Sequence, residues 1–398
     1  MLLTTIGEAF EINPQVRIPK GTEVPFVSMD QVVPGQRNVS AAEKRLFKGG
    51  SKFEHGDTLM ARITPCLENK KIAQYLPPNH ASPSAGSTEF IVIRGKNGVS
   101  ITPFAYYFVQ SPDIHELAIS LMTGTSGRQR VDTEAFRMSE IWLPNLTTQE
   151  KIVRVLGSLD DKIAVNNKMI RIILELQKSI WIQNNVKNLS QIHLINIAEP
   201  ILGGTPKRSD NSLWNGDILW ASVADMTSVS NSHLLTTAEQ ITEKAAETKR
   251  FAPLPTGSVL LSARGTVGHV ISLATPAAFN QSAYGFIAPK GYETALRLAI
   301  EDTVEELKSK SYGSVFSTIT KQQINECLIP DVFNESFAEL HAKLNSLETR
   351  IVIAEQENQT LARTRDELLP LLMSGKITVR DAEEASAEVG VDKHEVEE

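Results

Sequence analysis

The side chains best suited to chemistry in this sequence are basic and hydroxyl groups in turn-rich segments. On loops, these groups contact the phosphates and base edges of nucleic acids. Both halves of the chain carry them, so both are candidates for binding DNA. For any single basic residue the alternative is a solvated surface charge. The candidate DNA-binding residues are Arg62, Thr64, Lys70, Lys71, Arg128, Arg130, Lys207, Arg208, Arg264 and Thr266.

Two of these arginines stand out because their surroundings recur. Arg62 follows an alanine after Gly-Asp-Thr-Leu, and Arg264 follows an alanine after Gly-Ser-Val-Leu-Leu. The recurrence predicts that the two arginines occupy equivalent positions in two related domains. Nearby aromatic residues give a weaker signal, since Trp214 and Trp220 are better explained as anchors of a core or turn than as platforms for stacked bases.

The other polar residues form no catalytic or metal-binding pattern. The sequence lacks a Gly-x-x-x-x-Gly-Lys-Ser/Thr phosphate loop, an Asn-Pro-Pro-Tyr-type amino-methyltransferase motif and histidines paired at metal-ligand spacing. Cys66 and Cys327 are isolated thiols. Asp160-Asp161 lies in a helical segment, where a solvated face or a subunit contact explains it better than acid–base catalysis. We therefore predict a protein that is not an enzyme and that uses no metal or cofactor.

An internal repeat organises the chain. Residues 131–163 recur at 319–351 with a constant offset of 188 and no gap. Leu156, Leu159 and Ile163 match leucine or isoleucine in the second copy, and Asp160 corresponds to Glu348. The chain therefore holds two copies of one unit, a globular segment followed by a long helix with periodic apolar residues.

Each of these helices carries apolar residues spaced alternately by four and three, which is the a/d pattern of a coiled coil. Polar residues interrupt the seam, Asn166 and Gln177 in the first copy and Asn358 and Arg365 in the second. Such residues commonly fix register. Pro370 should kink or end the second helix. The predicted interface residues are Ile152, Leu156, Leu159, Ile163, Ile170, Leu340, Leu344, Leu347, Ile351 and Leu361.

The helices can pair with each other because about 140 residues separate them. A helix of about 36 residues reaches roughly 54 Å, which is one to one and a half turns of DNA. We predict an α/β (α+β) fold with two globular domains separated by two long antiparallel coiled-coil helices. The predicted divisions are a first globular domain at 1–147, a first helix at 148–185, a second globular domain at 186–334, a second helix at 335–380 and a tail at 381–398.

The charge balance does not argue against a nucleic-acid ligand. The formal net charge of −7 comes from residues 381–398, which hold eight acidic residues and one lysine, so residues 1–380 sum to zero. We predict that this acidic segment is a disordered tail. Hydrophobic residues make up 41% of the chain, yet no run is long enough to cross a membrane, and the N-terminal residues do not resemble a signal peptide. A cytoplasmic protein is expected.

Several motifs, in order and doubled, resemble the specificity subunits of type I restriction–modification systems over about residues 1–380. The second domain opens with Gly203-Gly204-Thr205-Pro206 and then Trp214-Asn215-Gly216-Asp217. The first helix resembles the family from Leu143-Pro144 to Ile163, and the exit resembles it at Leu371–Val379. The first domain lacks the Gly-Gly-Thr-Pro opening, and the second helix lacks the glutamine found at Gln149. These departures indicate that the halves have diverged.

The resemblance implies two target-recognition domains, each reading one half of a split target on double-stranded DNA. It also implies that the helices set the spacer and dock two methyltransferase subunits, which restriction and translocase subunits then join. One alternative is an orphan DNA-binding adaptor of the same fold without a restriction complex. Others are an enzyme that acts alone, such as a nuclease, and a structural coiled-coil protein, although doubled domains of unequal sequence argue against the last.

Overall fold

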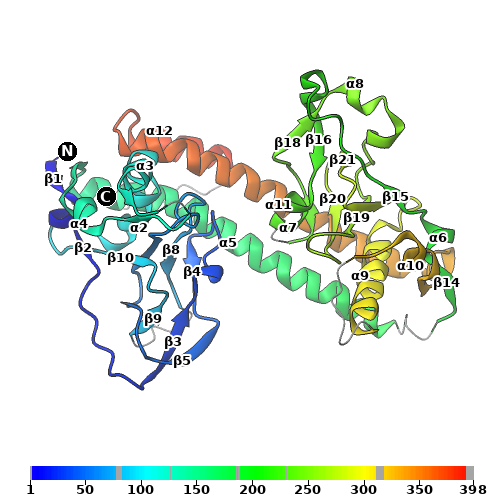
Figure 1. The fold of residues 1–398 in the computed structure, drawn as a ribbon, viewed down its shortest axis with the longest axis horizontal. Coiled ribbons are helices and arrows are strands. Elements are labelled where there is room, and N and C mark those ends of the chain that lie inside the picture. Colours follow the sequence, from blue (N-terminus) through cyan, green and yellow to red (C-terminus); the bar gives the residue numbers. More distant parts are fainter. Residues whose placement is uncertain are drawn as a thin grey trace. The chain divides into compact units, whose positions relative to one another are not determined.

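A computed structural model of the chain divides into two compact units, each of which is described by itself (Figure 1). Unit 1 comprises residues 1–165 and 357–398, and unit 2 comprises residues 166–356. Two long helices contribute to both units, α5 (Leu146–Gln183) and α11 (Ala338–Met373). The structure describes residues 2–77, 83–125, 127–184, 186, 189–229, 231–310 and 318–390.

Unit 1 is built on a five-stranded sheet of order β2-β10-β7-β8-β4, beside a four-stranded sheet of order β5-β3-β9-β6. Two short ladders, β1-β13 and β11-β12, complete it. The strands are β1 (Leu2–Thr5), β2 (Phe10–Ile12), β3 (Glu23–Val27), β4 (Asn38–Val39), β5 (Glu43–Leu46), β6 (Ser51–Phe53), β7 (Thr58–Ala61), β8 (Ile72–Tyr75), β9 (Ser84–Gly86), β10 (Phe90–Gly95), β11 (Met122–Thr123), β12 (Arg130–Val131) and β13 (Glu140–Leu143).

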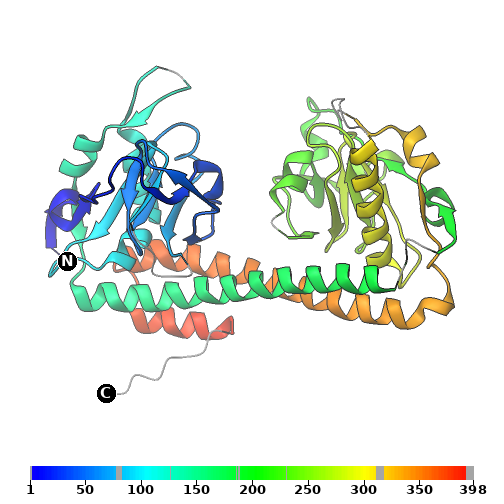
Figure 2. The ribbon, with the colours of Figure 1, turned by 90° about the horizontal axis from the view of Figure 1, so that it is seen from below.

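The helices of unit 1 pack an aromatic core against the five-stranded sheet. The rings of Phe10 and Phe108 lie 4.7 Å apart between centroids, and both are buried. Seen from below, α5, α11 and α12 lie on one side of this unit and the β11–β12 hairpin on the opposite side (Figure 2). The unit's own helices are α1 (Ile6–Ala9), α2 (Thr102–Gln110), α3 (Pro112–Ser120), α4 (Thr133–Met138), α12 (Val379–Glu388) and the 3-10 helix η1 (Met29–Gln31).

Apolar residues recur at helical spacing throughout 103–122, as in a single helix, but the structure has two helices there. Helix α2 ends at Gln110, and α3 begins at Pro112. Ser111 between them is extended, with a ψ of 140°. A residue that precedes proline is disfavoured in helical conformation, because the proline ring clashes with its backbone. Pro112 therefore divides an otherwise continuous apolar stripe.

Unit 2 repeats the plan with a five-stranded sheet of order β15-β22-β19-β20-β17, a three-stranded sheet of order β18-β16-β21 and the ladder β14-β23. Its strands are β14 (Gln191–His193), β15 (Ile201–Leu202), β16 (Trp214–Ala221), β17 (His233–Leu234), β18 (Glu239–Ile241), β19 (Val259–Ser262), β20 (Val270–Leu273), β21 (Ala277–Phe279), β22 (Ala283–Phe286) and β23 (Leu328–Pro330). Its helices are α6 (Leu194–Ile197), α7 (Val223–Ser228), α8 (Glu243–Ala246), α9 (Glu293–Lys310), α10 (Lys321–Glu326), η3 (Asn211–Leu213), η4 (Lys249–Phe251) and η5 (Glu335–Phe337).

The long helices pair antiparallel. In unit 2, Ile170 of α5 clusters with Ile351 of α11, whereas Gln177, two turns later, contacts Leu344, two turns earlier. In unit 1, Leu159 clusters with Leu361. The predicted fold class, with two globular domains and antiparallel spacer helices, is confirmed. Eight of the ten predicted interface residues are buried and two, Ile163 and Leu347, are partly buried.

The seam is not covered by the helices alone along its full length. Ile152, Leu156 and Leu159 belong to the same cluster as the globular core of unit 1, and Leu340 and Leu344 belong to that of unit 2. Between these ends, one cluster consists only of residues from α5 and α11, with Ile170, Ile173, Ile351 and Ala354 at its centre. The ends of each helix are therefore anchored by a domain, and the middle by the partner helix.

The prediction of a disordered tail from residue 381 is wrong for residues 381–388, which belong to helix α12. Thr378 and Asp381 form a capping box at its start. Ala382 is fully buried in the core cluster of unit 1, and Ala385 and Val389 pack against it. These small residues recur at helical spacing between the acidic ones, so one face is apolar while the acids face water. Residues 391–398 lie outside the described residues.

Candidate nucleic-acid interface

In unit 1 a single carboxylate holds two of the predicted arginines. Arg130 donates to Glu89 through Nη2 at 2.7 Å and through Nε at 3.0 Å to the second oxygen. Arg62 Nε lies 3.5 Å from Glu89 Oε2, without hydrogen-bond geometry. The hydrogen bonds from Arg130 lower the pKa of Glu89. Two guanidinium groups on one carboxylate leave one positive charge, which is suited to an anionic ligand.

Backbone hydrogen bonds bring Arg62 and the β11–β12 hairpin together. The Arg62 amide donates to Glu89 O, and Arg62 O accepts from Val131, both at 2.9 Å. The Thr64 amide donates to Gln129 O at 3.1 Å. Residues on two hairpins that are far apart in sequence thus form one surface. The backbone hydrogen bonds between the two hairpins fix the positions of these residues.

The remaining candidates of unit 1 differ in availability. Arg128 is exposed in the turn of the hairpin, and Lys70 is exposed with a φ of 51°. Lys71 is occupied, because its ammonium group donates to Met29 O at 2.9 Å. Arg62, Thr64, Arg128 and Arg130 therefore form the more coherent group, with Lys71 serving structure.

In unit 2, Arg208 is held over two tryptophans. Its guanidinium carbon lies 4.1 Å from the ring centre of Trp214 and 5.0 Å from that of Trp220, and it pairs with Glu239. The indole of Trp220 donates to Gly204 O at 2.9 Å. The tryptophans are buried anchors, as the sequence indicates, and Arg208 is fastened to them. Lys207 beside it is exposed.

Arg264 and Thr266 lie in the exposed loop that follows β19. Among the described residues, the guanidinium of Arg264 makes no ion pair. Its amide donates to Ser282 O at 3.1 Å, which fixes the start of the loop. Of the two candidate arginines of unit 2, Arg208 is held by Glu239, and Arg264 is the freer one.

The two arginines are not equivalent, although the Ala-Arg pairs suggest it. The backbone of Ala263, not of Arg264, repeats the contacts of Arg62, since Ala263 N donates to Ser282 O and Ala263 O accepts from Ile319. Between the leading glycine and the Ala-Arg pair, unit 2 has one residue more than unit 1. Successive side chains point to opposite sides of extended backbone, so Arg62 and Arg264 leave the sheet in different directions.

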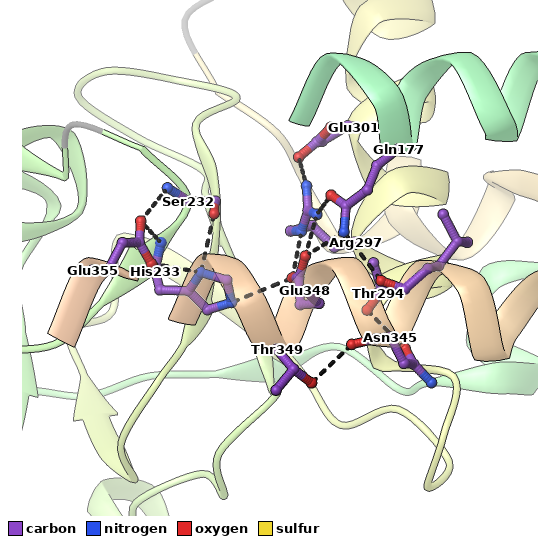
Figure 3. A network of polar contacts seen from close by, with 11 residues as sticks. Gln177, Ser232, His233, Thr294, Arg297, Glu301, Asn345, Glu348, Thr349 and Glu355 are labelled. Carbon is purple, nitrogen blue, oxygen red and sulfur yellow. Dashed lines mark hydrogen bonds and ion pairs between the residues drawn. The ribbon is translucent and has the colours of Figure 1, made fainter. Parts of the chain in front are cut away.

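Behind this surface, unit 2 contains a buried polar network that the sequence did not predict (Figure 3). Arg297 of α9 is 1% exposed and donates through Nη2 to Glu348 Oε2 of α11 at 2.9 Å. It also donates to Gln177 of α5 at 2.8 Å. His233 of β17 lies 3.3 Å from Glu348 and 2.8 Å from Glu355 between nitrogen and oxygen. We call these five residues the Glu348 cluster.

Charges in the Glu348 cluster stabilise one another. Burial disfavours the charged imidazole of His233, but hydrogen bonds and charge from Glu348 and Glu355 outweigh it and raise the pKa to about 9. Burial likewise disfavours ionised Glu348, but the charge of Arg297 and the contacts with His233 lower its pKa to about 2. At neutral pH Arg297 and His233 are therefore both cationic, and Glu348 is ionised.

Unit 1 holds the counterpart at the matching place in the repeat. Asp160 of α5 accepts from Arg365 of α11 at 2.6 Å and from the Tyr107 hydroxyl at 2.7 Å. Arg37 donates to Tyr107 at 3.2 Å and pairs with Asp161. We call Asp160, Tyr107, Arg37 and Arg365 the Asp160 cluster. The prediction that Asp160 lies on a solvated face or at a subunit contact is wrong; Asp161, by contrast, is exposed and pairs with Arg37.

Sequence reasoning missed Arg297, His233 and Arg37 because nothing near them repeats. A signal did exist on the helices, where Asp160 and Glu348 are one repeat apart and so are Gln177 and Arg365. Helix positions that keep a polar residue in both copies indicate an internal contact that both copies share. Within the described parts of the chain, no group of three or more His, Cys, Asp or Glu side chains is placed to hold a metal ion. No helix in those parts has the length and apolar character of a membrane span.

Comparison with known proteins places this arrangement in a family. The Type I restriction modification DNA specificity domain matches residues 68–175 and 186–335. The chain is 30% identical over 155 residues to the type I restriction enzyme EcoAI specificity subunit of Escherichia coli, covering 38% of this chain and 26% of that protein. It is 27% identical over 175 residues to the MjaIX specificity subunit of Methanocaldococcus jannaschii, covering 43% of this chain and 40% of that protein.

One solved structure shares the fold over nearly the full length. The crystal structure of the type I restriction–modification S subunit from M. genitalium has a TM-score of 0.56 at 14% identity. The match covers 93% of this chain and 95% of that one. The chain spans well under half the length of the curated relatives given above, so the structural match supports the fold across the parts that those alignments leave out.

Proposed function

Because the chain belongs to the family of type I restriction–modification specificity subunits, we propose that it is the sequence-specific DNA-binding subunit of such a complex. Each globular domain reads one half of a bipartite target on double-stranded DNA. Two methyltransferase subunits carry out the chemistry, and restriction and translocase subunits join through them. The chain itself recognises and positions the DNA.

The proposal rests on one observation: the two units share a framework, but the loops that follow their central strands carry different side chains. Both units have a five-stranded sheet whose central strand, β7 or β19, leads directly into a loop with an arginine. In unit 1 this region presents Arg62 and Arg130 around Glu89, and in unit 2 it presents Arg264 alone. A duplicated scaffold with unlike side chains is suited to reading two unlike sequences, since base edges are distinguished by side-chain donors and acceptors.

We propose that α5 and α11 set the number of base pairs between the two half-sites. Both helices are long, at 38 and 36 residues. The ends of each helix are built into a globular core, and buried polar contacts fix the register between them. A helix anchored in this way transmits a change of length as a change of spacing.

The docking surface for a methyltransferase subunit is proposed on α5. Met169, Ile172 and Leu176 are exposed and recur at spacings of three and four, so they form a second apolar stripe outside the seam. Lys168, Arg171 and Lys178 flank it with Glu175, which leaves a basic rim. An amphipathic helix with acidic flanks from the methyltransferase fits such a stripe.

Two variants test the docking surface. Ile172→Asp should prevent the chain from co-purifying with its methyltransferase subunits, because a charge in the middle of the stripe cannot be desolvated. Gln359→Asp places the same charge at an exposed position of α11, outside the stripe, and should leave assembly intact. Equal assembly of both variants would place the docking surface elsewhere.

The proposed function is tested by mapping methylated adenines in DNA from the host with and without the gene. The proposal expects one bipartite motif to lose methylation when the gene is deleted, and to regain it when the gene is restored. Methylation that is unchanged by the deletion would contradict the proposed function. Purified chain that cuts or methylates DNA without partners would also contradict it.

A further inference from the structure

A cationic surface lies on unit 1, at the edge strand of the four-stranded sheet. All four residues of β5 are exposed, and the strand is paired on one side only, to β3. Lys44 and Arg45 lie on the strand. Hydrogen bonds from Gly21 to Phe47 O and from Phe47 to Thr22 O, at 3.0 and 2.8 Å, extend the ladder and bring the neighbouring Lys20 and Lys48 to its end. Lys52 lies on β6, the opposite edge strand of this sheet, and its ammonium group reaches the ring of Phe47.

Few carboxylates neutralise these cations. Arg45 is paired with Glu43 through a hydrogen bond of 2.8 Å. Within the described residues, Lys20, Lys44, Lys48 and Lys52 make no ion pair with any carboxylate. Aromatic rings support two of the cations, since Arg45 lies 4.3 Å from the ring centre of Phe26 and Lys52 lies 5.5 Å from that of Phe47. Lys44 and Arg45 are neighbours on β5 and point to opposite faces of the sheet, whereas Lys20 and Lys48 lie in the turns beside β5. We call Lys20, Lys44, Arg45, Lys48 and Lys52 the β5 edge.

The corresponding edge of unit 2 carries fewer cations, although Lys244 stands at the same offset as Lys48 and donates to Ser212 Oγ at 2.8 Å. Phe26 pairs with Glu43 across β3 and β5, and Trp220 pairs with Glu239 across β16 and β18. Phe26 and Trp220 each pair on their other side with a parallel strand, β9 or β21. This register aligns Lys44 with Gln240 and Arg45 with Ile241. The glutamate is kept at both edges, and Arg208 takes the place of Arg45 as its partner.

Protection of an edge strand against aggregation does not explain this difference. Charged residues, lysine especially, block edge-to-edge pairing. Strand β18 itself carries Glu239 and Gln240 and no lysine, so a positive sign is not needed for protection. The cations of unit 1 also continue beyond the strand to Lys20, Lys48 and Lys52. The feature to be explained is the sign and extent of the charge.

We infer that the β5 edge is a binding surface for the DNA phosphate backbone, and that the matching edge of unit 2 offers fewer cations. This rests on the proposed function, because it assumes that unit 1 docks on DNA. Lysine ammonium groups contact phosphates as point charges and carry no base preference. The half-site read by unit 1 therefore has additional phosphate contacts, and recognition of the two half-sites differs in its salt dependence.

The test compares two triple variants of the full chain, assembled with its methyltransferase subunits. Lys20→Gln/Lys44→Gln/Lys48→Gln removes three cations of the β5 edge. Lys96→Gln/Lys290→Gln/Lys376→Gln removes three exposed lysines elsewhere. Each lost phosphate contact lowers the slope of log affinity against log salt by about 0.9, so the first variant should lose roughly 2 to 3 from the slope. Binding to target and unrelated DNA should weaken alike, and the control should keep the wild-type slope.

The outcomes separate this inference from the proposed function. A wild-type complex without sequence-specific binding overturns both. Wild-type binding to a bipartite target, with the β5 edge variant matching the control, overturns only the inference. A changed recognition sequence in that variant also overturns it, because the lysines would then contact bases. Ethylation interference should show additional phosphates at the half-site of unit 1, and these should disappear in the β5 edge variant.

Discussion

The Asp160 and Glu348 clusters occupy the same place in the repeat but balance their charge differently. In unit 1 the cation bound to the carboxylate comes from the opposing helix, as Arg365. In unit 2 the opposing helix supplies neutral Gln177, and the cations come from the globular domain, as Arg297 and His233. Tyr107 contacts the carboxylate in unit 1, where Arg297 does so in unit 2.

The difference shows which part of the arrangement the duplication preserves. A buried carboxylate needs a hydrogen-bonded cation, because an unpaired buried charge is strongly unfavourable. The position of the carboxylate and the contact from the opposing helix are kept in both units. The source of the positive charge is free to change with the domain. The long helices can thus stay attached to each globular domain while the sequences of the two domains diverge.

The largest expected effect is the loss of Glu348. Glu348→Ala leaves Arg297 and His233 buried without their shared carboxylate, which should destabilise the protein by about 3–5 kcal/mol. Asp160→Ala should cost less, because it removes one ion pair, that with Arg365, whereas Glu348→Ala removes two and leaves Arg297 with Glu301 and His233 with Glu355. Urea unfolding of both variants measures the difference. Glu116→Ala, which removes an exposed carboxylate, is the control. An equal or larger cost for Asp160→Ala would contradict the comparison.

A smaller effect is expected from pH, and only in unit 2. The pKa of His233 is raised from 6.5 to about 9 in the folded protein. The stability from this shift is therefore present below pH 6.5 and is lost as pH rises toward 9, by roughly 3 kcal/mol at most. The groups facing the imidazole are Ser232, Glu348 and Glu355, and the Asp160 cluster contains no histidine.

Hydrogen exchange between pH 6.5 and 9 checks this prediction. After correction for the intrinsic rate, protection of the amides at 231–234 should fall with pH, while that of the amides near Asp160 should not. His233→Gln should abolish the difference. A decline of equal size in both units would mean that His233 is not its cause.

The smallest expected effects concern Arg62 and Arg264, the arginines that follow the central strands of the two units. Arg62→Ala and Arg264→Ala should each weaken binding by about 1–3 kcal/mol if a base contact is lost, at opposite half-sites. Arg130 remains on Glu89 in the first variant, so that loss should be the smaller one. Binding assays with one half-site altered at a time measure both. An arginine whose removal leaves binding and methylation unchanged belongs to the solvated surface.

Much of the fold could be predicted because it depends on periodicity. The a/d spacing and the repeat gave the paired helices, and the composition gave the mixed globular domains. Residues 381–388 were wrongly predicted to be disordered, because acidic residues dominate the composition there and the small apolar residues at 382, 385 and 389 are few. Arg62 and Arg264 were wrongly predicted to be equivalent, because the Ala-Arg motif does not show the one extra residue that precedes it in unit 2. A shift of one residue moves a side chain to the other face of a strand. Arg297 and His233 could not be found, since Glu348, the partner they share, is more than 50 residues away in sequence from either.

The central claim is that each unit reads its own half of the target. The most direct measurement exchanges residues 190–332 for the matching segment of a relative and maps the methylated sequence. The account predicts that one half of the motif changes, while the other half and the spacer length stay the same. An exchange that alters both halves, or neither, in a chain that still assembles with its methyltransferase subunits would contradict it.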